Sequence, residues 1–484
     1  MLFSLEIAVH NMKRKIIHWG IPVLLTLLFI AGRITAYGPM IDSVAAHDTE
    51  SYFAAAAADF PSIAFFEQMR SATLPLLIKI LNPSMEHTIL ILSEPFFGTE
   101  PKLAVQPGTE SIILFQTVFS IMAWIFFILI LCSRLNHAIS KALLAGILYF
   151  FAFVPQIADW DAILLSESLS FSLFLFMMGI LVILQPKIIR KSSFHAADLL
   201  PVLLFLLVSA LWLFTRDTNA YFIAFLAIIF LLTAFILWIR NKSLPIIAIL
   251  LTILLSGIFV FQQHTFKKSE RWLLPFLNNM SANVFPYPGR TAFFEKRGMP
   301  VSEEILSQSG SAEYNQLYDQ TDFIKWAKED GLAAYTAFLI DMPLWSVLQV
   351  YSNLDLFFEE NLQPFFFGDA SEKPHWADSV GNLLHPLSAA TILIDLLLLL
   401  ILIRIALVKK DALTWNWAGF CLLLFAGGIL LMSLSFLGEV RSIWRHVLCG
   451  VFPLRLVLWI LCVVLFDQVP AMKFMANSAQ QFKQ

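Results

Sequence analysis

Long apolar runs recur along the chain, and short polar connections that carry most of the charged residues separate them. A helix rises about 1.5 Å per residue, so roughly 20 apolar residues are needed to cross the hydrocarbon layer of a bilayer. The pattern therefore predicts about ten membrane-spanning helices. The predicted spans are 16–37, 111–132, 138–156, 163–185, 199–215, 219–239, 244–262, 386–408, 413–436 and 446–466.

The first long connection, 38–110, contains two apolar stretches that are too short to span a membrane. "SIAFFEQMRSATLPLLIKILNP" has apolar residues at helical spacing, interrupted by Pro75, and "TILILSEPFF" follows it. Both stretches are typical of helices that lie along the membrane surface. We expect this connection to cover a cavity at the membrane.

The second long connection, 263–385, is the part of the chain most typical of a water-soluble domain. Its clearest helix is "TDFIKWAKEDG", which Thr321 or Asp322 would cap and Gly331 would end. An amphipathic helical stretch around Pro343 follows, rich in the aromatic residues that favour a membrane interface. The predicted organisation is a transmembrane module at 1–262, a small helical cap at 263–385, and C-terminal helices with a tail at 386–484.

The composition supports a membrane protein. Hydrophobic residues make up 58% of the 484 residues and charged residues only 14%, which is more apolar surface than a soluble fold of this size can bury. The predicted fold class is an all-α polytopic membrane protein. The N-terminal "MKRKIIHWGIPVLLTLLFIAG" is interpreted as a retained signal anchor, because no small-residue cleavage site follows it cleanly.

The basic residues predict the orientation, because short cytoplasmic connections are enriched in Lys and Arg. With the N-terminus inside, every short basic connection falls on the cytoplasmic side. Both termini are then cytoplasmic, the long connections are external, and a bacterial inner membrane is the expected location. The basic residues of these short connections are Lys13, Arg14, Lys15, Arg134, Lys141, Lys187, Arg190, Lys191, Arg240, Lys242, Lys409 and Lys410.

A net charge of −3 without a basic stripe gives no indication of nucleic-acid binding.

Charged residues of both signs gather at the predicted external ends of the spans. An ionisable group near the bilayer is costly unless it is paired or solvated, so this concentration predicts a function. Arginine binds two phosphate oxygens at once, and a nearby carboxylate suits either deprotonation of a hydroxyl or coordination of a divalent ion. The candidate site residues are Asp48, Glu50, Arg70, Asp159, Asp161, Glu167, Arg216, Asp217, Glu439, Arg441, Arg445 and His446.

Several of these residues also have a purely structural interpretation. Asp48 could be the N-cap of an alanine-rich helix that ends at Asp59-Phe60-Pro61. Glu167 could be solvated by lipid headgroups, and Arg216 could simply pair with its neighbour Asp217. The four cysteines show no C-x-x-C spacing, so neither a disulfide framework nor a zinc site is indicated.

The order of these parts resembles the GT-C superfamily of integral-membrane glycosyltransferases, in the layout of the protein mannosyltransferase and aminoarabinose transferase type. The resemblance rests on "HDTESYF" after the first span, "MRSATLP", "WDAILLSESLS" and an "EVRSIWRH" before the last span. Asp48-Thr49-Glu50 replaces the adjacent Asp-Glu pair of the protein O-mannosyltransferases, so the resemblance does not extend to protein mannosylation.

The resemblance implies a reaction and its partners. The donor would be a polyprenyl-phosphate-linked sugar, and the acceptor a lipid, a glycan or a protein at the membrane. Asp48, with Glu50 next, would deprotonate the acceptor hydroxyl, and the sugar would be transferred with inversion. Arg216 and Arg441, ahead of Arg70 and Arg445, would stabilise the departing phosphate. No cofactor is certain, and a divalent metal ion remains open because relatives differ on this point.

Two other functions fit parts of the pattern. A transporter or flippase would place charges in the middle of its spans, and Asp395 and Arg404 lie in the span 386–408. A glycan polymerase or ligase would also have external arginines and a large late loop. The other spans are nearly free of central charges, no repeat is seen, and the long external cap suits an enzyme, which favours the transferase over a transporter. The long acidic connection at 38–110 favours it over a polymerase or ligase.

Overall fold

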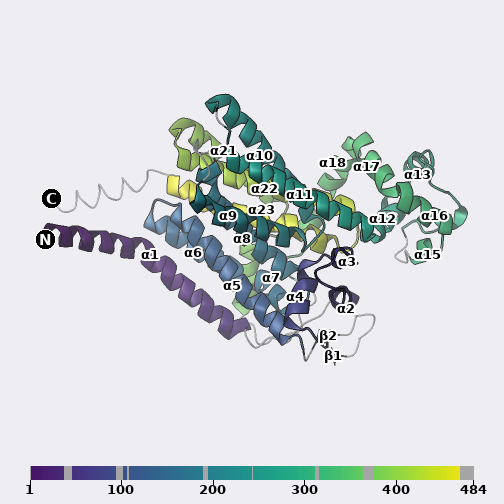
Figure 1. Cartoon of the computed structure of the whole chain (residues 1–484), viewed down its shortest axis with the longest axis horizontal. Coiled ribbons are helices and arrows are strands. Elements are labelled where there is room, and N and C mark those ends of the chain that lie inside the picture. The colour runs from purple at the N-terminus through teal and green to yellow at the C-terminus, as the bar shows by residue number, and fades with distance from the viewer. Residues whose placement is uncertain are drawn as a thin grey trace.

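Most of the described chain is helical, as predicted. The computed structural model describes residues 2–37, 46–93, 102–105, 108–188, 195–242, 244–310, 315–362 and 375–468. Within this part, nine helices are long and apolar enough to cross a membrane, which confirms an all-α polytopic membrane fold (Figure 1). These helices are α1 (Leu2–Tyr37, apolar from His18), α5 (Glu110–Ser133), α8 (Glu167–Ile188), α9 (Ala196–Leu213), α10 (Asn219–Asn241), α11 (Ile246–Lys268), α21 (Ala390–Lys409), α22 (Ala412–Gly438) and α23 (Ile443–Gln468).

The predicted span 138–156 is not one straight helix. It consists of α6 (Ala138–Phe153), α7 (Pro155–Ala158) and the 3₁₀ turn η1 (Asp159–Ala162), with a bend of 60° after α6. Pro155 lacks an N–H to continue the helix, and Val154 before it takes an extended conformation. Counted as one bent span, this segment brings the candidate spans in the described chain to ten. A second bent pair, Thr321–Asp341 with Pro343–Ser352 at 85°, brings them to eleven.

Two helices form the centre of the bundle. The apolar parts of α8 and α23 are 89% and 83% buried, whereas that of α1 is 17% buried. A helix that is apolar on all sides lies either inside a protein core or in a membrane, and these two helices are enclosed by the rest of the bundle. Arg445 in the first turn of α23 contacts Glu167, the first residue of α8, so the two central helices start at the same end of the bundle.

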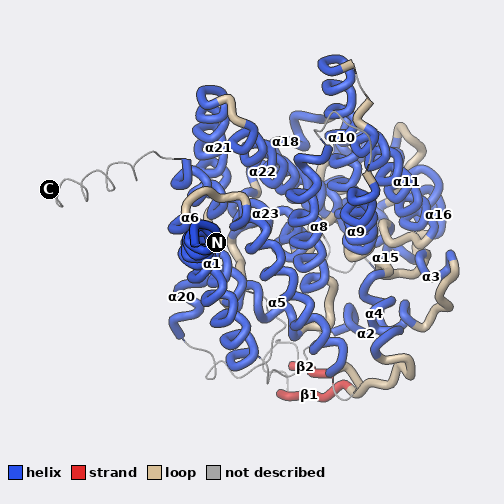
Figure 2. Tube along the Cα trace, turned by 60° about the vertical axis from the view of Figure 1, so that its left-hand side comes forward, coloured by secondary structure: helices blue, strands red, loops and turns tan. Residues whose placement is uncertain are grey.

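The connection after α1 forms short helices and a hairpin, α2 (Ala46–Ala56), α3 (Ile63–Phe66), α4 (Thr73–Leu81), β1 (Ile89–Ser93) and β2 (Lys102–Val105). Figures 1 and 2 show the hairpin at the same end of the molecule as α2 and α4.

Two predictions for this connection were wrong. The stretch "TILILSEPFF" contains a strand, not a surface helix, because β1 pairs with β2 in antiparallel register, Ile89 opposite Val105. Pro75 lies in the first turn of α4 and does not interrupt it, since the N–H that proline lacks would have no helical partner there. The interruption falls instead between α3 and α4.

The second connection has a hydrophobic core of its own, which Trp326, Phe294 and Phe276 share. The predicted helix end at Gly331 was wrong, because the chain continues through a π-helical turn into the next helix. A side chain at Gly331 would press on the Phe276 ring, 2.9 Å away, so close packing explains this glycine. Residue Gln320 precedes the helix, and neither Thr321 nor Asp322 caps it. The elements are α12 (Leu273–Asn279), η2 (Met280–Val284), α13 (Pro288–Glu295), α14 (Glu303–Leu306), α15 (Asn315–Tyr318), α16 (Thr321–Trp326), η3 (Ala327–Gly331), α17 (Leu332–Asp341), α18 (Pro343–Ser352), α19 (Leu354–Phe358) and α20 (His375–Leu384).

This second unit is attached to the end of α22. Asn279 donates to the carbonyl of Gly438 at 2.9 Å, and the Tyr335 hydroxyl donates to the carbonyl of Leu437 at 2.7 Å. The last carbonyl groups of a helix have no partner within it, so these bonds satisfy groups that would otherwise be unpaired. The attachment fixes the short segment that leads from α22 into α23.

Helices α22 and α23 cross at two glycines, which gives a prediction about stability. A methyl group at Gly450 would overlap the backbone nitrogen of Met432, and one at Gly428 would lie 2.9 Å from the Gly450 carbonyl oxygen. Small residues let membrane helices approach closely, and overpacking costs about 1–3 kcal/mol. We expect Gly450→Ala to lower the melting temperature of the purified protein in detergent by several degrees. Gly257→Ala in α11, where nothing lies within 4 Å, is the control and should leave it unchanged.

Candidate functional site

Asp48 lies in the first turn of α2, as its third residue. It is therefore not the N-cap that the local sequence suggested. One carboxylate oxygen accepts a hydrogen bond from Arg70, and the other accepts one from Arg445 at 2.5 Å. Arg70 is itself held by the hydroxyl of Ser51 at 2.5 Å and lies over the ring of Tyr52. The carboxylate is thus positioned by two arginines from distant parts of the chain.

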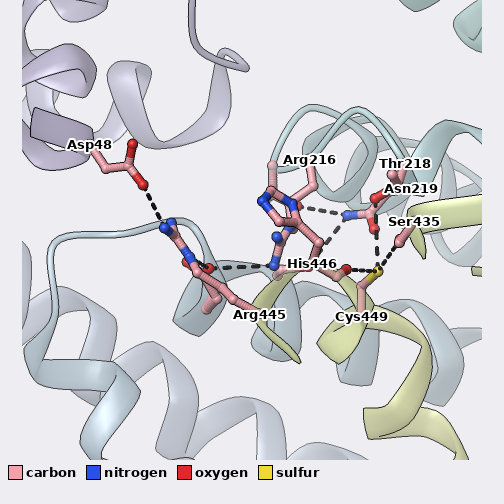
Figure 3. A network of polar contacts seen from close by, with 11 residues as sticks. Asp48, Arg216, Thr218, Asn219, Ser435, Arg445, His446 and Cys449 are labelled. Atoms are coloured by element: carbon pink, nitrogen blue, oxygen red, sulfur yellow. Dashed lines mark hydrogen bonds and ion pairs between the residues drawn. The ribbon is translucent and has the colours of Figure 1, made fainter. Parts of the chain in front are cut away.

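Arg445, in the first turn of α23, connects two carboxylates (Figure 3). Its Nε donates to Glu167 at 2.6 Å, while its Nη1 donates to Asp48. Glu167 is the first residue of α8, and its side chain is fully buried. The same Glu167 oxygen, Oε1, accepts a weaker bond from Arg216 at 3.4 Å. The structure therefore brings Asp48, Arg70, Glu167, Arg216 and Arg445 together, and we call these five residues the arginine–carboxylate cluster.

The cluster has more positive than negative charge, since three guanidinium groups face two carboxylates. Burial alone raises the pKa of the Asp48 carboxyl, but Arg70 and Arg445 outweigh this effect and hold the pKa at about 2. Because this value lies below the ordinary 3.8, the pairing stabilises the folded chain above about pH 4. That contribution is lost as the pH falls towards 2.

His446 lies beside Arg216, on the side of the cluster away from Asp48 (Figure 3). The polar contacts continue from there to Cys449, whose thiol lies 3.3 Å from the Ser435 hydroxyl and donates to the His446 carbonyl oxygen. His446 is thus positioned on α23, one residue after the arginine that joins the two carboxylates.

Asp217 does not pair with its neighbour Arg216. It forms a two-bond contact with Arg271, at 3.0 Å for each bond. Arg271 also donates to the carbonyl oxygens of Phe66 and Gln68, at 3.1 and 2.8 Å. The Asp217–Arg271 ion pair, together with the two backbone hydrogen bonds of Arg271, therefore connects the segment before Arg70 to the end of α11.

Asp161 also has a partner outside the cluster. It forms an ion pair with Arg33 of α1 and accepts a hydrogen bond from the Ser168 hydroxyl at 2.5 Å. Both charged side chains are almost completely buried. Asp159, two residues earlier, is also buried. These contacts tie α1 to the turn before α8, and so support the position of Glu167.

The remaining candidates lie at the edge of the site. Glu439 accepts hydrogen bonds from Asn278 at 3.0 and 3.1 Å and from the backbone N–H groups of Val440 and Arg441. Burial raises the pKa of the Glu439 carboxyl, and these bonds offset only part of the effect. Arg441 is half-buried in the same segment, and Glu50, two residues after Asp48 on α2, is exposed.

Both oxygens of Asp48 are held by arginines. In the described part of the chain no three His, Cys, Asp or Glu side chains are grouped so that they could hold a metal.

Sequence reasoning missed two arginines that organise the site, Arg33 and Arg271. Arg33 had a usable signal, because it is a charge inside an apolar run, and such residues usually face a partner in the protein. Arg271 follows two lysines in "KKSERW" and looks like an ordinary flanking charge. Its role depends on Asp217, 54 residues earlier, which no local pattern predicts.

Comparisons with known proteins add a likeness to solved membrane enzymes. No protein-family model and no curated protein matches the chain. Archaeal oligosaccharyltransferase AglB from Archaeoglobus fulgidus, in complex with an inhibitory peptide and a dolichol-phosphate, aligns with 96% of this chain and 52% of its own, at 12% identity and a TM-score of 0.43. The Archaeoglobus fulgidus oligosaccharyltransferase tethered with an acceptor peptide aligns with 92% of this chain and 49% of its own, at 14% identity and a TM-score of 0.43.

The chain thus spans about half the length of the oligosaccharyltransferases that it matches. At these identities and TM-scores the likeness does not assign the chain to a family. The function is therefore argued below from the arginine–carboxylate cluster.

The buried pair of Asp161 and Arg33 gives a second prediction about stability. Asp161→Asn leaves the Arg33 guanidinium buried without a countercharge, and breaking such a pair typically costs about 3–5 kcal/mol. We expect a large drop in melting temperature and in yield from membranes. Asp59→Asn removes the same charge at an exposed position and is the matched control. A melting temperature of Asp161→Asn equal to that of the control would contradict the role of this pair.

Proposed function

We propose that the protein is a membrane glycosyltransferase of GT-C type that transfers a sugar from a polyprenyl-phosphate donor to an acceptor hydroxyl. The observation that carries the proposal is the Arg445 guanidinium, which is shared between Asp48 and Glu167 at the end of the two most buried membrane helices. A phosphate clamp next to a positioned carboxylate is the arrangement that this transfer needs.

Arg445 and Arg216 are the proposed phosphate ligands. Both point at Glu167 in this structure, and the excess of positive charge favours an anion. A guanidinium group binds two phosphate oxygens in parallel, so a phosphate can replace the carboxylates as its partner. The lipid chain of the donor would extend into the bilayer beside the ends of the helices that carry these residues.

Asp48 is the proposed general base. Its carboxylate takes the proton of the acceptor hydroxyl, whose oxygen attacks the anomeric carbon of the sugar from the side opposite to the phosphate. The bond between that carbon and the phosphate oxygen breaks, and its electron pair leaves with the lipid phosphate. Arg445 and Arg216 stabilise the negative charge that develops on the departing phosphate. The configuration at the anomeric carbon is inverted.

Donor binding would also activate the base. With both arginines in contact, Asp48 is a weak base because its pKa is about 2. When the donor phosphate draws Arg445 away, Asp48 loses one of its two positive neighbours, and its pKa rises. The base would thus become effective only after the donor is bound, which limits proton transfer in the empty enzyme.

The predicted orientation places this chemistry on the external face, and the predicted location is a bacterial inner membrane with both termini in the cytoplasm. The proposed sugar and the proposed acceptor, whether lipid, glycan or protein, depend on the groups that surround the arginine–carboxylate cluster. These assignments remain part of the proposal.

Transfer and donor binding should respond differently to two substitutions. Asp48→Asn is expected to slow transfer at least 100-fold, because a positioned base contributes about 10²–10⁴, while donor binding stays the same or tightens. Arg445→Gln is expected to weaken donor binding at least tenfold. Binding and transfer are measured in nanodiscs with radiolabelled polyprenyl-phosphate sugars offered singly, and label is followed into lipid, glycan and protein fractions.

The matched control is Arg297→Gln, which removes an arginine paired with Asp341 on the cap surface. It should keep both activities. Unchanged transfer by Asp48→Asn would exclude this residue as the base. Movement of the lipid across the bilayer without transfer of sugar would favour a flippase instead.

The pH dependence tests the activation of Asp48. The acid limb of kcat/KM reports the free enzyme, where the pKa of Asp48 is about 2, and the acid limb of kcat reports the donor complex. Because the phosphate withdraws Arg445, we expect the acid limb of kcat to lie at higher pH than that of kcat/KM. A phosphodiester donor does not itself titrate in this range. Coincident limbs would show that the donor leaves the arginines on Asp48.

A further inference from the structure

Helix α18 of the cap has an apolar face that the described chain leaves uncovered. Leu344, Val347, Leu348 and Tyr351 are 70, 64, 49 and 70% exposed. Their spacing of three and four residues places them on one side of the helix, and we call these four residues the apolar stripe. A contiguous group of exposed apolar side chains marks a surface that another partner covers.

The other side of α18 is already packed. Ser346 is buried and donates to the carbonyl oxygens of Leu339 and Met342, at 3.3 Å in each case. Trp345 packs against the core of the cap, whereas Val350 packs against a cluster that α22 and α23 share. Helix α18 therefore joins the cap to the membrane bundle and turns only the apolar stripe outwards.

The height of α18 along the bundle follows from the lengths of two helices. Lys409 at the end of α21 and Thr414 near the start of α22 both bond to the side chain of Gln468, at 3.0 and 3.1 Å, so α21 and α22 are aligned at this end. Helix α21 has 20 residues, or about 30 Å, which equals the thickness of the hydrocarbon layer. Helix α22 has 27 residues and is about 10 Å longer, so its last turns extend beyond that layer.

Helices α18 and α19 pack against these last turns of α22. The rings of Phe357 on α19 and Phe436 on α22 have centroids 4.8 Å apart, and Val350 packs against the cluster that contains Met432. Figures 1 and 2 show α18 beside α22, and in Figure 1 α13 and α16 lie further from the bundle. Headgroups occupy about 5–7 Å on each side of the hydrocarbon layer, which is the height of α18.

The charged residues around the apolar stripe agree with this height. Pro343–Ser352 contains no charged residue. Before it, Asp341 pairs with Arg297 at 3.0 Å, and after it, Asp355 is exposed. Charge becomes costly deeper in the bilayer, so a stripe with a charge at each end can enter only the outermost part of the hydrocarbon.

A further arginine lies on the cap side of the stripe. The Arg290 guanidinium is 3.7 Å from the ring centroid of Tyr287 and 4.9 Å from that of Trp345, the residue after Leu344. Tyrosine and tryptophan are enriched where a membrane meets water, and an arginine beside them can keep its charge among the headgroups. The surroundings of the stripe are thus typical of this level.

We propose that the apolar stripe of α18 is immersed in the membrane leaflet on the side of the arginine–carboxylate cluster, at the boundary between headgroups and acyl chains. Interfacial helices bury an apolar face by about 5–10 Å at this boundary. The cap is thereby held against the membrane surface by its own lipid contact, in addition to its bonds with the end of α22.

The bilayer is favoured over a second copy of the chain because the stripe continues the lipid-facing surface of the bundle. Val350 of α18 and Ile392 of α21 pack against the same cluster, and Leu393, the next residue of α21, is 64% exposed. The same lipids that surround α21 can therefore cover the stripe without any other protein.

The test measures what surrounds a bimane fluorophore attached to a single introduced cysteine in the full chain. Val347→Cys labels the stripe, Leu397→Cys labels an exposed position within α21, and Val301→Cys labels an exposed valine of the cap outside α18 as the matched control. All three carry Cys462→Ser, because Cys462 is exposed and the other native cysteines are buried. Quenching is recorded in nanodiscs with lipids brominated near the headgroup or near the chain end, and with iodide in the water.

We expect bromine near the headgroup to quench the Val347 label at least twofold, and bromine near the chain end to quench it less. The Leu397 label should show the opposite order, and the Val301 label should respond to iodide alone. Melting temperatures of the labelled proteins report folding, and Leu344→Cys repeats the measurement at a second position of the stripe.

Two results would overturn the proposal. Quenching of the Val347 label by iodide as strong as at Val301, without quenching by brominated lipid, would place the stripe in water. Protection of the label from both quenchers would show that protein, such as a second copy of the chain, covers the stripe. Neither result depends on the glycosyl transfer proposed above, because no donor sugar is present.

Discussion

The position of the candidate site depends on one guanidinium group shared between two carboxylates. Arg445 contacts Asp48 on α2 and Glu167 at the start of α8. It therefore joins the membrane bundle to the connection between α1 and α5. Both carboxylates would be unfavourable in this setting without a positive partner. The other two arginines, Arg70 and Arg216, complete the pairing from further segments. The site is therefore made of groups that stabilise one another, and the proposed function requires an anionic substrate to separate them.

Two supporting ion pairs keep this arrangement in place without joining it. Asp161 with Arg33 anchors the turn that leads to Glu167, and Asp217 with Arg271 anchors the segment that leads to Arg70. Each pair is more deeply enclosed than Asp48, whose side chain is 35% exposed. Among Asp48, Asp161 and Asp217, the Asp48 side chain is thus the most exposed, as the proposed role of general base requires.

The two ends of the bundle present different chemistry to the two sides of the membrane. At one end, carboxylates and arginines form a network that a ligand must rearrange. At the other end, Arg134, Gln185 and Trp417 line a small cavity with no acidic residue among its lining groups. A network of paired charges suits the proposed reaction, in which partners are exchanged. Helix α8 connects the two ends, since Glu167 and Gln185 are both on it.

The sequence by itself determined the membrane class, nearly all of the spans and the set of charges at their ends, because apolar length and charge placement are local properties. It also identified all five members of the arginine–carboxylate cluster, although among twelve candidates. Only the tertiary structure decided which of them meet. Asp217 pairs with Arg271 and not with its neighbour Arg216, and Asp161 pairs with Arg33. Pairing in a membrane protein follows helix packing and not sequence distance. The strand at Ile89–Ser93 likewise depends on its pairing with Lys102–Val105, which the apolar pattern of its own segment does not show.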